Sequence, residues 1–186
     1  MPHFATRPET NPPELRRRAA AALGIRVALR PVMATAHAFD HAPLASEVST
    51  TLSVGAGAAY EIFADTVEIP RWLPLIQKAR VTQRLPDGRA SRVAFTRKLE
   101  RGSLGYTLEY SYEPNTYTVK WEAPADSTMV LSGEARFIPL SPRACMMLYR
   151  VVIDLPVVDD LITDELDGHP ASLVVSEFRE HLRRLC

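Results

Sequence analysis

Apolar and polar residues alternate along several stretches of this chain. Over Leu104–Glu113, leucine and tyrosine at the even positions alternate with glycine, threonine, glutamate and serine. A period of two residues is typical of a strand that buries one face. Alternation and the turn residues between segments predict strands near Glu47–Val54, Lys78–Arg84, Arg89–Arg97, Leu104–Glu113, Thr116–Ala123, Leu131–Ile138 and Ala144–Asp154.

Two other segments have the period of a helix. The first is a short helix that Gly55-Ala56-Gly57 opens directly after the first strand and that runs through about Asp65; Pro70 and Pro74 prevent it from continuing. The second runs from about Ala171 to Leu185 and closes the sequence. Its apolar stripe consists of Val174, Phe178 and Leu182, beside Val175 and Leu185.

This order of elements predicts an α+β domain over residues 46–186. An antiparallel sheet with only two helices has few ways to bury its apolar face. We therefore expect a curved antiparallel sheet of six to seven strands wrapped around the long C-terminal helix, with a lipophilic hollow between them.

Residues 1–45 are predicted to be an extension outside this domain, disordered or loosely helical. They hold six of the 15 prolines, show no alternation and carry a local charge of +3. An export signal, a transit peptide and a start at Met33 are alternative interpretations. Arg26 and Arg30 interrupt the apolar core that an export signal needs.

The composition excludes some classes of function. Lysine plus arginine and aspartate plus glutamate both number 22, which argues against nucleic-acid binding by bulk charge. Two cysteines give no disulfide framework or metal spacing and fit a reducing cytoplasm. No apolar stretch approaches the ~20 residues of a membrane span, so we expect no integral membrane association. No cofactor is predicted, and the oligomeric state stays open.

The strongest candidate site is an aromatic face on two neighbouring strands. It contains four tyrosines and one tryptophan, and buried tyrosine hydroxyls need polar partners. Apolar walls with a few hydroxyls are typical of a pocket for a lipophilic molecule that bears oxygen. The predicted ligand-binding residues on strands and helix are Phe95, Tyr106, Leu108, Tyr110, Tyr112, Tyr117, Trp121, Phe137, Val174 and Phe178.

Two arginines on strands complete this prediction. Arg97 has the parity of Val93 and Phe95, which points it toward the hollow, where it would meet a carboxylate or enolate. Arg150 lies on a strand with two apolar faces, so its direction is ambiguous. His169, before the last helix, is expected to cap that helix, and the acidic stretch between Asp154 and Asp167 is expected to be a solvated loop.

The chain resembles the helix-grip proteins of the START-like (SRPBCC) superfamily, with the polyketide cyclase/dehydrase and lipid-transport group closest. The likeness covers about residues 46–185. It is carried by the order of the elements and by the segments Val48–Val54, Ala59–Phe63, Trp72-Leu73-Pro74 and Gly133–Leu140. The resemblance implies the same fold and adds Trp72 to the expected ligand-binding residues.

Three functions follow as expectations. The favoured one is binding or carriage of a hydrophobic small molecule, such as a lipid, quinone, polyketide or aromatic compound. The alternatives are a polyketide aromatase/cyclase or dehydratase and a non-catalytic interaction module; no catalytic residue is assigned. A hydroxyl-lined cavity with one unpaired arginine would favour the enzyme. A cavity with Arg97 and Arg150 both in salt bridges that point outward would favour the carrier. A core without a cavity would favour the interaction module.

Overall fold

The computed structural model describes residues 44–99, 102–154 and 170–185. The predictions for the N-terminal extension up to residue 43, the acidic stretch from Asp159 to Asp167, His169 and Cys186 lie outside the described residues. No helix of the described residues is long and apolar enough to cross a membrane.

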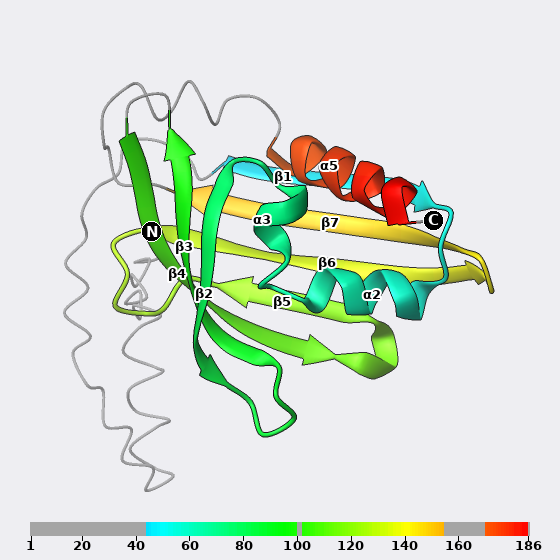
Figure 1. Cartoon of the computed structure of the whole chain (residues 1–186), viewed down its shortest axis with the longest axis horizontal. Helices are drawn as coiled ribbons and strands as arrows, with labels where there is room; N and C mark the ends of the chain where they lie inside the picture. Colours follow the sequence, from blue (N-terminus) through cyan, green and yellow to red (C-terminus); the bar gives the residue numbers. More distant parts are fainter. Residues whose placement is uncertain (1–43, 100–101, 155–169, 186) are drawn as a thin grey trace, which may run out of the picture. The chain divides into compact units, whose positions relative to one another are not determined.

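Seven strands form one antiparallel sheet in the order β1-β7-β6-β5-β4-β3-β2 (Figure 1). Consecutive strands from β2 to β7 are neighbours, and β1 joins at the far edge beside β7, the last strand. The strands are β1 Leu44–Leu52, β2 Ile76–Arg84, β3 Ala90–Leu99, β4 Gly102–Glu113, β5 Thr118–Glu122, β6 Val130–Ser141 and β7 Ala144–Asp154.

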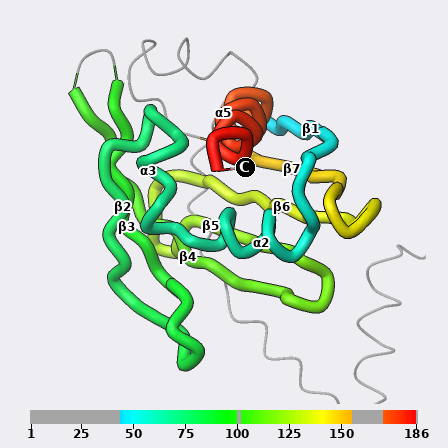
Figure 2. The backbone as a smooth tube through the Cα atoms, turned by 45° about the vertical axis from the view of Figure 1, so that its right-hand side comes forward, coloured from blue at the N-terminus to red at the C-terminus, as the bar shows by residue number. Residues whose placement is uncertain are grey.

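Helices cover one face of this sheet. Helix α5 (Pro170–Leu185) lies against β1 and β7, and helix α2 (Ala56–Ala64) lies along β5, β6 and β7 (Figures 1 and 2). The short helix α3 (Ile69–Trp72) contacts β2 and α5. The predicted α+β helix-grip architecture is therefore confirmed, including the short helix after the first strand.

The helices form for local reasons. The buried residues of α2 recur at helical spacing and consist of Ala56, Ala59, Tyr60, Phe63 and Ala64. In α5 the buried residues are Ala171, Val175, Phe178 and Leu182. Pro170 begins this helix, where the missing N–H of proline has no intrahelical partner to lose.

Some boundaries differ from the sequence predictions. The first strand begins at Leu44, three residues before the expected start, because its N-terminal residues pair with the end of β7. The segment after α2 contains a four-residue helix with Pro70 in its first turn, where proline is tolerated. Between β4 and β5 the chain forms a 3-10 turn over Pro114–Thr116, and Tyr117 adopts the left-handed conformation at a φ of 49°.

Candidate functional site

A cavity of about 150 Å³ lies between the sheet and the start of α5. It is bounded by the ends of β3, β4, β6 and β7, by α3 and by the first turns of α5. Most of its wall is apolar. The lining residues are Phe63, Ile69, Trp72, Leu73, Leu75, Ile76, Phe95, Arg97, Leu99, Leu104, Tyr106, Leu108, Tyr110, Trp121, Met129, Leu131, Tyr149, Val151, Ile153, Pro170, Leu173 and Val174.

The strand register places the aromatic side chains of this wall. Phe95 on β3 is paired with Tyr106 on β4, and their rings stack with centroids 5.5 Å apart. Tyr110 is paired with Trp121 on β5, and the Trp121 ring lies 5.4 Å from that of Tyr149 on β7. Because side chains two residues apart point to the same face of a strand, this pairing builds a continuous aromatic wall across four strands.

Three tyrosines give the cavity its hydroxyl groups. Burial raises the pKa of Tyr106 to about 12, although the nearby Arg97 charge lowers it. Burial also raises the pKa of Tyr110 and that of Tyr149, and neighbouring tyrosines act in the same direction. At neutral pH all three phenols are therefore protonated and able to donate a hydrogen bond.

One cationic side chain joins these hydroxyls. Arg97 follows Phe95 by two residues on β3, so it lies on the cavity face, opposite Leu104 of β4. Its Nε is enclosed and has no hydrogen-bond partner among the described residues. Within the same residues, the cavity wall contains no carboxylate, histidine or cysteine side chain.

The cavity brings together eight of the thirteen residues that were expected to bind a ligand. These are Trp72, Phe95, Arg97, Tyr106, Leu108, Tyr110, Trp121 and Val174. The other five do not line it; they are Tyr112, Tyr117, Phe137, Arg150 and Phe178.

Three of these five lie elsewhere for clear structural reasons. Phe137 and Phe178 are fully buried and pack with Phe63 in the core beneath α2 and α5. Arg150 is exposed, one residue after the buried Tyr149, and lies in a polar depression on the opposite face of the sheet with Glu134.

Of the remaining two tyrosines, Tyr112 lies near the end of β4 and Tyr117 directly before β5. The ring of Tyr117 packs beside that of Tyr60 on α2, with centroids 5.9 Å apart. The hydroxyl of Tyr112 donates a hydrogen bond of 2.9 Å to the carbonyl of Ala90. Tyr117 thus packs the sheet against α2, Tyr112 links β4 to β3, and neither tyrosine lines the cavity.

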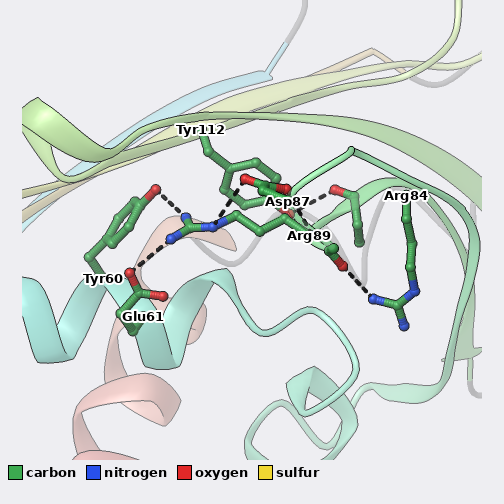
Figure 3. Close-up of polar contacts among 8 residues, drawn as sticks. Tyr60, Glu61, Arg84, Asp87, Arg89 and Tyr112 are labelled. Carbon is green, nitrogen blue, oxygen red and sulfur yellow. Dashed lines mark hydrogen bonds and ion pairs between the residues drawn. The ribbon is translucent and has the colours of Figure 1, made fainter.

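Arg89 forms a clasp at this end of the sheet (Figure 3). Its guanidinium lies 5.0 Å from the ring centroid of Tyr60 and 5.2 Å from that of Tyr112. It donates hydrogen bonds to the Tyr60 hydroxyl and, at 2.8 Å, to Glu61 Oε1. Asp87 Oδ2 lies 3.8 Å from Arg89 Nε. The arginine thus joins the β2–β3 hairpin to α2 by charge and by stacking.

Sequence reasoning missed Tyr149. It lies on a strand that is apolar on both faces, so alternation gives no direction. Only burial in the structure separates the two faces of β7: Cys145, Met147, Tyr149, Val151 and Ile153, which have the same parity, are all buried.

No known family model matches this chain, and no curated protein matches it. Solved structures do. A START superfamily protein from Mycobacterium smegmatis superimposes with a TM-score of 0.66 at 16% sequence identity, covering 76% of this chain and 99% of that one.

Two enzymes also match. The Zhui aromatase/cyclase from a Streptomyces species has a TM-score of 0.63 at 14% identity and covers 77% of this chain and 95% of its own. A norcoclaurine synthase from Thalictrum flavum has a TM-score of 0.55 at 9% identity, covering 78% and 98%. At such identities the likeness establishes the fold alone, and the chain therefore has the START-like, helix-grip fold.

Proposed function

We propose that this protein binds a hydrophobic small molecule in the cavity between the sheet and α5. The observation that carries the proposal is the cavity itself, whose wall is apolar and aromatic apart from Arg97 and three tyrosine hydroxyls. Such concave, mostly apolar sites with a few polar groups are typical of small-molecule binding. An interaction module, by contrast, is expected to have a core without such a cavity.

The driving force is burial of the ligand's apolar surface. One aromatic ring buries roughly 150 Å², which at about 25 cal/mol per Å² gives about 4 kcal/mol. This free energy corresponds to a dissociation constant of about 1 mM before the costs of association. A ring alone is thus held weakly, and the polar groups of the wall must add affinity and fix the orientation.

A polyketide cyclase or dehydratase is a second candidate. It is supported by the hydroxyl-lined cavity with Arg97, the pattern expected of the enzyme, and by the fold of the Streptomyces aromatase/cyclase. General acid–base catalysis is most efficient when the catalytic group titrates near the operating pH. The cavity tyrosines have raised pKa values, and His181, the histidine of the described residues, does not line the cavity. The described lining residues therefore favour binding over acid–base catalysis.

Native mass spectrometry tests the proposal on full-length protein purified from its own host. We expect a co-purifying hydrophobic molecule at near one-to-one stoichiometry, which organic extraction then identifies. If none is found, and if an environment-sensitive apolar dye also fails to bind at micromolar concentration, the binding function is wrong. Incubation with a poly-β-ketone separates the two candidates, because only the cyclase converts it to a cyclised product.

A further inference from the structure

Arg97 is the one charged side chain that lines the cavity in the described part of the chain. It forms no ion pair with a carboxylate of the described residues, and its enclosed Nε has no hydrogen-bond partner among them. A partly buried guanidinium without a counter-charge is unfavourable. An anionic group in the cavity would supply that counter-charge.

The hydroxyl groups near Arg97 are also donors. Tyr106 is close enough to Arg97 for the cation to lower its pKa. Tyr106 in turn raises the pKa of both Tyr110 and Tyr149, and all three tyrosines line the same cavity as Arg97. No hydrogen bond joins these three hydroxyls to a described residue. Arg97 and three phenolic O–H donors therefore line one apolar wall, and no carboxylate lies among the described lining side chains. A carboxylate, which only accepts hydrogen bonds, complements this set.

The volume of the cavity limits the rest of the ligand. About 150 Å³ in an apolar core is enough for one benzene ring. Phe95, Trp121 and Tyr149 offer ring edges and faces against which a flat apolar body can pack.

We infer that the ligand is a single-ring aromatic carboxylate, whose anionic group lies beside Arg97 and Tyr106 and whose ring lies against the aromatic wall. This inference rests on the proposed binding function and specifies its ligand class. A charge-assisted hydrogen bond in such a site is expected to strengthen binding by about 10- to 100-fold over a neutral analogue.

Tryptophan fluorescence provides the measurement, because both tryptophans of the chain, Trp72 and Trp121, line the cavity. The full chain is titrated with three probes of similar shape: para-toluate, para-methylbenzyl alcohol and para-methylbenzylamine. We expect para-toluate to bind about 10- to 100-fold more tightly than the alcohol, and the cationic amine to bind most weakly.

The variant Arg97→Gln is expected to lose the preference for para-toluate and to keep the affinity for the alcohol. Arg97→Lys keeps the charge without the planar fork and should retain part of the preference. Arg80→Gln is the matched control, since Arg80 is an exposed arginine on the neighbouring strand β2, outside the cavity wall. Should Arg97→Gln fail to fold, Tyr106→Phe is measured in its place, with a several-fold loss of preference expected.

The outcomes separate this inference from the proposed function. If para-toluate and the alcohol bind equally to the natural chain, or if Arg97→Gln keeps the preference, the carboxylate inference is overturned and the binding function stands. If none of the three probes binds and no apolar dye binds either, the proposed function fails and the inference fails with it.

Discussion

Gly133 shows how one residue shapes the aromatic wall. It lies on β6 opposite Trp121 of β5 and Val151 of β7. A Cβ atom at this position would lie 2.5 Å from Trp121 Cζ2 and 2.5 Å from the backbone oxygen of Arg150. The indole of Trp121, which lines the cavity, thus occupies space that only a glycine leaves open.

We expect Gly133→Ala to lower the free energy of unfolding by about 1–3 kcal/mol, because the backbone oxygen of Arg150 cannot move away as a flexible side chain would. Urea denaturation measures the loss. Gly105→Ala is the control, since the nearest atom to a Cβ there is the Phe95 oxygen at 4.0 Å. Equal stabilities of the two variants would contradict the packing described for Gly133.

The cavity tyrosines predict an alkaline dependence of stability. Burial raises the pKa of Tyr106 from 10.0 to about 12, so the folded state prefers the neutral phenol. Its contribution, up to about 3 kcal/mol, is present below pH 10 and is lost as the pH rises from 10 toward 12. Tyr110 and Tyr149 act in the same direction.

Urea denaturation at a series of pH values between 8 and 12 checks this dependence, and the ultraviolet absorbance of tyrosinate reports the ionisation. This range spans roughly two pH units on each side of the ordinary tyrosine pKa. We expect stability to fall above pH 10, and to fall less steeply in Tyr106→Phe. A natural chain whose stability is unchanged up to pH 12 would show that these phenols are not buried.

At the scale of elements, the Arg89 clasp joins α2 to the β2–β3 hairpin. Replacing Arg89 with methionine keeps an apolar stem but removes the charge, and it leaves the buried Tyr60 hydroxyl without its donor. We expect a loss of about 1–3 kcal/mol in stability and faster hydrogen exchange in α2.

The matched control for this prediction is Arg80→Met, an exposed arginine on β2 for which the described residues provide no ion pair. The control should change stability by less than about 0.5 kcal/mol. If Arg89→Met and Arg80→Met behave alike, the clasp does not hold the helix to the hairpin.

The strands also show which parts of the site could be predicted from the sequence. Alternation predicted the strands and the face of Tyr106, Leu108 and Tyr110, because a period of two fixes the side of a strand directly. The same parity holds for Tyr112, but β4 is longer than the cavity, and this end of the strand lies at the Arg89 clasp. Position along a strand relative to a cavity depends on tertiary packing, which parity does not contain.

The other differences from the predicted site concern Tyr117, in a turn, and the residues of the central strand β7. Tyr117 lies in the turn before β5, in the left-handed conformation, and its ring packs beside that of Tyr60 on α2. On β7 both faces are largely apolar, so neither the exposed Arg150 nor the cavity-lining Tyr149 could be assigned from the pattern. The hollow itself was predictable from the order of elements, whereas its small volume follows only from the packed side chains.

At the scale of the whole domain, the cavity lies between the sheet and α5, and different residues of α5 face the core and the cavity. Ala171, Val175, Phe178 and Leu182 of α5 pack into the core, while the partly buried Val174 lies beside them and faces the cavity. The helix therefore both completes the core and closes the site, and a side chain at position 174 can fill the space without replacing a core residue.

The most direct test of the account is dye binding to Val174→Phe, compared with Ser176→Phe, an exposed position on the same helix. The full chain and both variants are titrated with an environment-sensitive apolar dye, with circular dichroism as the check of folding. We predict that the natural chain and Ser176→Phe bind the dye alike and that Val174→Phe loses at least about tenfold in affinity, which corresponds to about 1.4 kcal/mol. Equal binding by a folded Val174→Phe would mean that the dye does not occupy the cavity, and it would contradict the proposal that this space is the ligand site.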